Sequence, residues 1–277
     1  FSDYDTYHAA TSAMDEAIRN CVATGAIPNR IAVLDNFSWG YTDRPETLGA
    51  LVRAAIACHD LALEWQVPFI SGKDSLNNEF SYQDSGGQRQ TIRIPHTLLI
   101  SALGQAAKDS QCVTTDLKQA GNRLLQVGAT YCEFAGSHFS LVRKLEGGQV
   151  PVVRPRQAWA IFEAVHRCMQ AGWIVACHDL SEGGLAVAIS EMAFAGRLGA
   201  VLDIASINIQ PANDETDQLS AAIPHDLIRL FSESNSRFVI EVPPAFLGNV
   251  QREFAGLPLA EIGVVAEAPQ LVVRSAD

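Results

Sequence analysis

Basic residues are scarce in this sequence, and long apolar runs are missing from it. Lys and Arg number 20 against 31 Asp and Glu, which gives a formal net charge of −11. Non-specific binding to nucleic acid or to an anionic membrane needs a basic surface, so we expect neither partner. No stretch approaches the roughly 18 uncharged apolar residues that span a bilayer, and the first ten residues lack a signal-peptide pattern. The sequence therefore predicts a soluble, cytoplasmic protein.

Cysteine motifs and the commonest nucleotide-binding motifs are also missing. The six cysteines form no CxxC pair and have no regular spacing, which argues against a zinc site or a disulfide framework. Two Cys-His-Asp runs, at 58–60 and 177–179, resemble fragments of a catalytic triad, but adjacent residues rarely converge on one reacting atom. Neither GxGxxG nor GxxxxGK(S/T) occurs, so the commonest nucleotide-binding folds are excluded.

The composition is that of a compact globular protein. The 277 residues are 48% hydrophobic and 18% charged, and this length suggests two domains of roughly 100 to 150 residues. Periodicity predicts a helix that follows Thr11 and Ser12 and stops at Gly25, and further helices at 46–66, 155–172 and 181–196. Strands are predicted at 31–35, 67–71, 123–130, 173–179, 199–204, 237–243 and 259–265, and 91–104 is predicted to hold two strands that pair with each other. A polar boundary at 106–122 separates two halves of intermixed strands and helices, which indicates an α+β fold.

The first candidate site lies on the first predicted helix. Glu16 and Asn20 are four residues apart, so both side chains lie on one helix face, next to the apolar stripe. A carboxylate and an amide carbonyl are suitable ligands for a hard cation such as Mg²⁺. The alternative is a solvated polar face.

A second candidate joins a predicted strand to a predicted helix. In the run from His178 to Gly184, two glycines beside a helix N-terminus permit an anion to approach free N–H groups, and Asp179 could hold a cation there. The alternative is that Ser181 caps the helix and Asp179 accepts backbone N–H groups.

Three polar loops complete the candidates. SGKDSLNN at 71–78 follows a predicted strand and concentrates a cation, a carboxylate, a hydroxyl and amides, although the same residues suit a β-turn. DNFSWG at 35–40 contains Trp39, which could flank a purine or belong to the core. SESNS at 232–236 is either a ligand loop or a turn.

Six ordered motifs together resemble phosphoribosylformylglycinamidine synthase, and more narrowly the second, C-terminal half of its synthetase region. That enzyme's superfamily also includes aminoimidazole ribonucleotide synthetase and selenophosphate synthetase. The resemblance covers essentially the whole chain, and SGKDSLNN and HDLSEGGLA are its most specific parts. The motifs are DEAIRN at 15–20, DNFSWG at 35–40, RPE at 44–46, SGKDSLNN at 71–78, HDLSEGGLA at 178–186 and SESNSRFVIEV at 232–242.

The resemblance implies an architecture and a reaction. Residues 1–107 would form an N-terminal domain that pairs into a central β-barrel, and 108–277 a C-terminal α/β domain. The implied activity is conversion of formylglycinamide ribonucleotide to the formamidine in purine biosynthesis, with ATP, Mg²⁺ and ammonia. ATP would phosphorylate the amide oxygen, and ammonia would displace phosphate from the iminophosphate. The implied partners are a phosphoribosyl substrate, a complementary synthetase half or a second copy, and a glutaminase subunit or domain.

The resemblance also implies roles for individual residues at an auxiliary nucleotide site. In large members of the family, a Glu and an Asn four apart, with the Asp and Ser of an HDxS motif, hold a magnesium–nucleotide. The matching positions are Glu16, Asn20 and Asp179 for the metal and Ser181 for the nucleotide.

Small members suggest the residues of the catalytic ATP site. By resemblance, Asp35, Gly72 and Lys73 would contact ATP, and Ser75 the substrate. Lys73 stands where small members have an Asn that binds magnesium. Because a cation cannot ligate magnesium, Lys73 could pair with phosphate instead while Asp74 faces the metal.

Two absences qualify the implied activity. The KxETHNHP-type motif, which supplies the family's catalytic histidine, does not occur, and neither does a glutaminase domain with a Cys-His-Glu triad. We therefore expect no catalytic residue here, and a fragment or one half of a longer enzyme that lacks full activity alone. The alternatives are a stand-alone synthetase or kinase of the superfamily that acts as a homodimer, and a non-catalytic half that holds a nucleotide for structural reasons.

Overall fold

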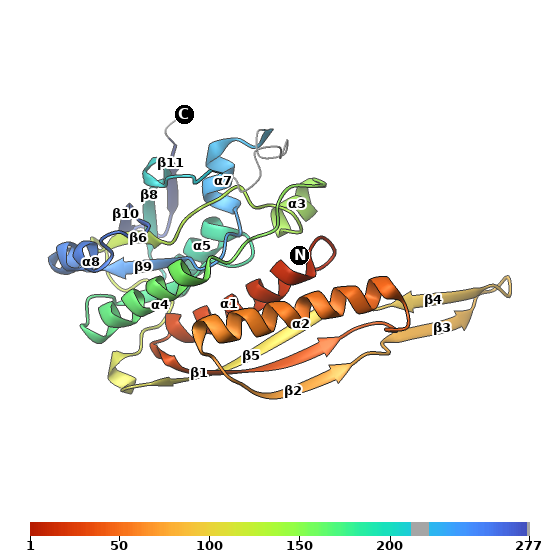
Figure 1. Ribbon diagram of the computed structural model, residues 1–277. Coiled ribbons are helices and arrows are strands. Elements are labelled where there is room, and N and C mark those ends of the chain that lie inside the picture. Colours follow the sequence, from red (N-terminus) through yellow and green to blue (C-terminus); the bar gives the residue numbers. More distant parts are fainter. Residues whose placement is uncertain (212–221, 276–277) are drawn as a thin grey trace.

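The first part of the chain forms a small sheet with two long helices on one face (Figure 1). A computed structural model describes residues 1–211 and 222–275. β2, β1 and β5 form a three-stranded sheet in that order, and β3 and β4 form a separate hairpin. The elements are α1 (Thr6–Ala23), β1 (Ala26–Ser38), α2 (Pro45–Trp65), β2 (Phe69–Ser75), β3 (Glu79–Gln83), β4 (Arg89–Arg93) and β5 (Thr97–Ala106).

The second part forms a larger sheet with helices around it, in agreement with the predicted mixture of strands and helices. Its strand order is β11-β8-β10-β6-β9-β7. The strands are β6 (Arg123–Val127), β7 (Ala176–Asp179), β8 (Gly199–Asp203), β9 (Phe238–Val242), β10 (Leu259–Ala266) and β11 (Leu271–Arg274). The helices are α3 (His138–Arg143), α4 (Pro155–Gln170), α5 (Gly184–Gly196), α7 (His225–Phe231) and α8 (Leu247–Glu253).

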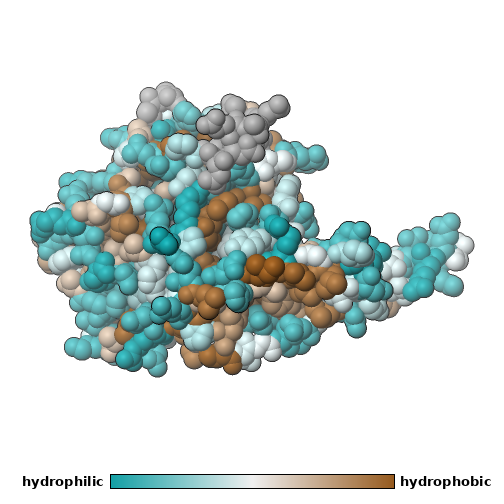
Figure 2. Space-filling view, in the orientation of Figure 1, coloured by the Kyte–Doolittle hydropathy of each residue, from teal (hydrophilic) through white to brown (hydrophobic). Residues whose placement is uncertain are grey.

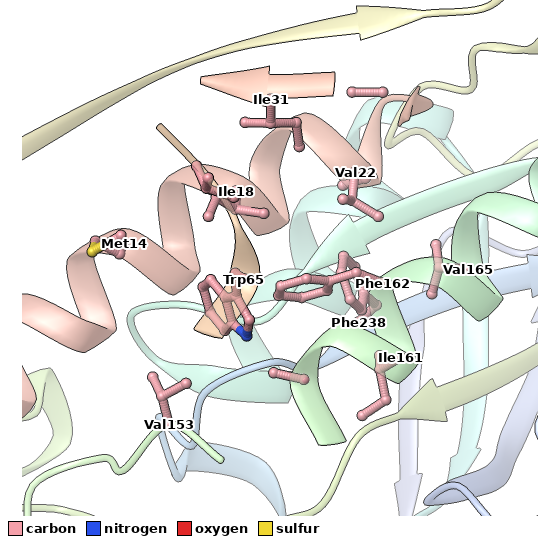
Figure 3. Packing of buried hydrophobic residues seen from close by; sticks show 14 of the residues in the cluster. Met14, Ile18, Val22, Ile31, Trp65, Val153, Ile161, Phe162, Val165 and Phe238 are labelled. Carbon is pink, nitrogen blue, oxygen red and sulfur yellow. The ribbon is translucent and has the colours of Figure 1, made fainter. Parts of the chain in front are cut away.

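One hydrophobic cluster joins the two parts (Figure 3). It contains Met14 and Ile18 of α1, Phe162 of α4 and Phe238 of β9, all fully buried. The Phe162 and Phe238 rings meet edge to face at 6.0 Å. The Trp65 indole of α2 donates to the Pro155 carbonyl at 2.9 Å, where α4 begins. This shared core fixes α1 against the larger sheet, and with it the polar residues of α1.

The other face of the three-stranded sheet is open. β2 is exposed along most of its length, and Ile70, Leu99 and Leu103 are each more than half exposed. Leu99 and Leu103 lie on the same side of β5 because strand side chains alternate between faces. A hydrophobic band also follows α2 on the surface (Figure 2), where Leu48, Val52 and Ile56 are spaced by four residues. Exposed apolar surface of this kind is typical of interfaces.

The structure corrects several predicted element boundaries. α1 begins at Thr6, because the Asp5 side chain caps it by accepting from the Tyr7 and His8 N–H groups. The two strands expected at 91–104 do not pair with each other: β4 pairs with β3, and β5 pairs with β1. Most of the predicted 71–78 loop is also strand, because β2 continues to Ser75 by pairing with β1.

In the second part of the chain, one strand and one helix begin later than predicted. The strand predicted from residue 173 begins at Ala176, and the helix predicted from residue 181 begins at Gly184. Within the described residues, no helix has the length and apolar character needed to cross a membrane.

Candidate functional site

The guanidinium of Arg19 is the centre of a buried polar cluster between α1 and the end of β7. Its Nε donates to Asp179 Oδ2 at 3.3 Å, its Nη2 donates to Ser181 Oγ at 2.9 Å, and its Nη1 donates to Asp15. Ser181 Oγ also donates to Asp179 Oδ2 at 2.6 Å, and Asp15 accepts from the Ser236 N–H at 3.0 Å. The cluster therefore ties the first helix to two loops of the larger sheet.

The structure brings Glu16 to this cluster and leaves Asn20 in solvent. Burial raises the pKa of the half-buried Glu16 carboxyl, and the nearby carboxylates of Glu182 and Asp179 raise it further, although Arg19 opposes them. Asn20, one turn further along α1, is exposed. In the described residues, no group of three or more His, Cys, Asp or Glu side chains is arranged to hold a metal. A cation here would also need amide, hydroxyl, water or phosphate oxygens.

Asp179 is held in its ionised form. Burial works to raise its pKa, but hydrogen bonds from His178 and Ser181 and the charge of Arg19 outweigh burial, so the pKa of Asp179 lies well below its usual value. His178 in turn contacts Glu191 through Nε2 at 3.0 Å. Burial alone would lower the pKa of His178, but these carboxylates raise it.

The start of α5 holds a carboxylate from the chain itself. Glu233 accepts from the Gly183 N–H at 2.9 Å and from the His138 N–H at 3.0 Å. This is the position where the sequence suggested a bound anion, and the preference of a helix N-terminus for negative charge explains it. The alternative that Ser181 caps α5 is wrong, because the residue before the helix is Gly183. A side chain at Gly184 would meet the Ser232 carbonyl at 2.4 Å.

A separate candidate site, around Asp35, lies on the smaller sheet, where Asp35 of β1 faces Gly72 of β2 in parallel register. A Cβ at Gly72 would lie 2.1 Å from Asp35 Oδ1, so only glycine leaves space for the carboxylate. Burial raises the pKa of Asp35, as does the charge of Asp74, while the Lys73 N–H lowers it.

The neighbouring polar residues of β2 face solvent. Lys73 and Asp74 are exposed, and the Lys73 ammonium donates to the Ser75 hydroxyl. Because strand side chains alternate between faces, the register separates these residues: Asp35 and Gly72 lie on the face that carries the buried Phe37, and Lys73 and Ser75 lie on the opposite, open face with Leu99.

Sequence reasoning missed three charged residues, two in the Arg19 cluster and one at the start of α5. Asp15 and Arg19 form a buried pair four residues apart on α1, and Glu233 closes the start of α5. The sequence contained the signal for the pair, because Asp and Arg four residues apart lie on one helix face, here the face that also carries the apolar Ile18.

Other residues that the sequence singled out are buried in the fold. Trp39 is almost fully buried and stacks on His96 at 4.9 Å, which agrees with the core interpretation. Ser232 and Ser234 are buried and bond to the Tyr131 backbone. Burial raises the pKa of Cys58 to about 12 and that of Cys177 well above its usual value, so neither Cys-His-Asp run holds a reactive thiolate.

Comparison with known proteins identifies the family. The family model described as "AIR synthase related protein, C-terminal domain" matches residues 119–275, more than half of the chain. The chain belongs to this family. As a member of the AIR synthase related family, it is similar along 99% of its length, at 31% identity, to the phosphoribosylformylglycinamidine synthase subunit PurL of Deinococcus radiodurans. It spans about a third of the length of that relative, 35%.

Solved structures share the AIR synthase related fold. The structure of PurLQS from Thermotoga maritima aligns with all of this chain at a TM-score of 0.70 and 18% identity, and 40% of that chain is covered. Hydrogenase maturation protein HypE aligns with 96% of this chain at a TM-score of 0.68 and 16% identity, and 79% of HypE is covered. At these identities the likeness shows the fold alone.

Proposed function

We propose that this chain is the ATP-binding second half of a phosphoribosylformylglycinamidine synthase. The observation that carries the proposal is the similarity to the PurL subunit of Deinococcus radiodurans along 99% of this chain. The whole enzyme would convert formylglycinamide ribonucleotide, ATP and ammonia to formylglycinamidine ribonucleotide, ADP and phosphate, in the cytoplasm. The chain itself would bind ligands and leave the catalytic histidine to the other half.

The region around Asp35 would bind the catalytic ATP. Asp35 and Gly72 would contact the nucleotide at their close approach, and Ser75 would contact the substrate. Lys73 would pair with phosphate, since an ammonium group attracts phosphate and repels magnesium. Asp74, exposed and near enough to raise the pKa of Asp35, would be the metal ligand in its place.

The region around Asp179 would hold an auxiliary magnesium–nucleotide. Glu16, Asn20 and Asp179 provide carboxylate and amide oxygens, the ligand type that Mg²⁺ takes while keeping positions for phosphate and water. Ser181 would contact the nucleotide. A bound magnesium ion would neutralise phosphate charge at this place, beside three carboxylates that influence the pKa of Glu16.

The open face of the smaller sheet would bind the partner. Its exposed Ile70, Leu99 and Leu103 suit an apolar sheet surface of similar shape, which is what a complementary synthetase half or a second copy would offer in a shared barrel. Ammonia would come from a glutaminase subunit or domain.

The test is an assay of the chain together with a complementary half, supplied with ATP, Mg²⁺, ammonia and formylglycinamide ribonucleotide. We expect the formamidine to form only when both halves are present, and Lys73→Ala to lower the rate. If two folded, associated halves form no formamidine, the proposal is wrong.

The coverage of HypE favours a second candidate, a stand-alone synthetase or kinase that acts as a homodimer. The alignment covers 79% of HypE, so a protein of about this length can contain the whole aligned fold. Nucleotide turnover by a homodimer without any other half, in a screen of acceptors, would support it.

A third candidate is a non-catalytic half that holds a nucleotide. Slow exchange of bound ADP, with lower thermal stability in Glu16→Ala, would favour this role. Rapid exchange and unchanged stability would exclude it.

A further inference from the structure

Arg19 occupies a position where a positive charge is needed whether or not a metal is bound. Its guanidinium is 2% exposed and directs its three nitrogens at three different partners, Asp15, Asp179 and Ser181. Asp179 and Ser181 are two of the residues proposed above to receive the metal and the nucleotide. The arginine therefore holds both of them with its own charge.

The charges around the guanidinium come from every element packed against it. α1 contributes Asp15 and Glu16, and the end of β7 contributes Asp179. The loop before α5 contributes Glu182, which acts on Glu16. The nearby cations are His178, beside Asp179, and Arg237, which is close enough for Arg19 to lower its pKa. The carboxylates outnumber the charges that pair with them, and this excess adds to the effect of burial in raising the pKa of the half-buried Glu16.

A fixed arginine acts in opposite directions on the two parts of a metal–nucleotide complex. It repels a free divalent cation that approaches Glu16 and Asp179, because like charges at short range are unfavourable. It attracts the phosphate oxygens that a nucleotide brings, because a guanidinium is a strong phosphate partner. The difference between these effects favours the complex over the free ion.

We propose that Arg19 is an internal counter-ion that makes this site selective for a divalent metal bound to a nucleotide over the free metal. The inference rests on the proposed auxiliary site and adds what selects its ligand. Arg19 is a positioning residue for Asp179 and Ser181, and it keeps them in place when no cation is bound.

The experiment measures Mn²⁺ binding by electron paramagnetic resonance in the whole chain, first with Mn²⁺ alone and then with Mn²⁺ and ADP. Arg19→Gln removes the charge and retains a hydrogen-bond donor. We expect Arg19→Gln to bind free Mn²⁺ on the order of tenfold more tightly and to bind Mn²⁺–ADP less tightly. Arg19→Lys retains the charge and should leave free Mn²⁺ binding close to that of the unchanged protein.

Two further variants keep the result interpretable. Asp179→Asn should remove the tight Mn²⁺ binding of Arg19→Gln, which assigns that ion to this site. Arg19→Gln could fail to fold because Asp15 loses its partner. In that case the double variant Asp15→Asn with Arg19→Gln should show the same changes in affinity for free Mn²⁺ and for Mn²⁺–ADP, but smaller ones.

Free Mn²⁺ affinity in a folded Arg19→Gln variant that is equal to or weaker than in the unchanged protein would overturn the proposal. Absence of Mn²⁺ binding in every variant would overturn it as well. These outcomes are distinct from failure of the proposed function, which the formamidine assay measures with both halves present.

Discussion

The two sheets differ in how much of their surface the chain covers by itself. All five residues of β9 in the larger sheet are buried, whereas β2 in the smaller sheet is exposed through most of its length. α4 and α5 pack against β9, while α1 and α2 cover only one face of the smaller sheet (Figure 1). The centre of the larger sheet therefore has a complete core, although its edge strand β11 is exposed, and the smaller sheet has a face that is suited to a partner.

The largest expected difference between the sheets is in core stability. Phe238 of β9 is fully buried against Phe162, so Phe238→Ala should lower the free energy of unfolding by about 3–5 kcal/mol. Leu103→Ala on the open face should cost less than about 0.5 kcal/mol in the isolated chain. Urea denaturation followed by circular dichroism measures both. Equal losses would mean that the open face is covered in the isolated chain.

The next prediction concerns the ion cluster that joins α1 to the larger sheet. Asp179→Asn should lower the free energy of unfolding by about 2 kcal/mol. This loss is smaller than for a buried charge left without any partner, because Arg19 still pairs with Asp15. The folded-state pKa of Asp179 lies below its usual value, so its contribution is present above that usual value and is lost as the pH falls through the folded pKa.

Urea denaturation at a series of pH values tests this prediction. The difference between the unchanged protein and Asp179→Asn should be largest near about pH 5, decrease as the pH rises through the raised pKa of His178, which Asp179 helps to raise, and shrink below about pH 4. A difference that grows as the pH falls below about 4 would contradict the sign derived for Asp179.

A third prediction addresses what the open face binds. Leu99→Asp places a charge on a surface that is exposed in the isolated chain, so it should leave monomer stability nearly unchanged. In an association with a complementary half or a second copy, it should raise the dissociation constant at least about tenfold, because the charge would be desolvated without a partner. Sedimentation velocity measures this effect. Leu48→Asp, on the exposed face of α2, is the matched control, and an equal effect of both variants would argue against the sheet face as the interface.

The order of helices and strands was accessible from sequence because it depends on local periodicity. Strand pairing was not, because β4 and β5 are neighbours in sequence but bond to different partners, β3 and β1. The buried role of Arg19 was also missed. Its partners Asp179 and Ser181 lie more than 150 positions away in the chain, and only the packing of α1 on the larger sheet brings them together.

The smallest predicted effect concerns Asp35. Asp35→Asn should change stability in the opposite direction from Asp179→Asn. Burial and the charge of Asp74 raise the pKa of Asp35, so its ionised form disfavours folding at neutral pH, and stability increases as the pH falls through the folded pKa. Asp35→Asn should therefore stabilise the isolated chain at pH 7 by about 0.3 kcal/mol, because solvent screens this half-buried group. The gain should disappear below about pH 4, where Asp35 is protonated in both states. Thermal unfolding of Asp35→Asn, with Asp74→Asn as the matched variant, measures this effect. A loss of stability in Asp35→Asn would mean that its carboxylate is needed to hold β1 against β2. The carboxylate beside Gly72 would then have a structural role like that of Asp179.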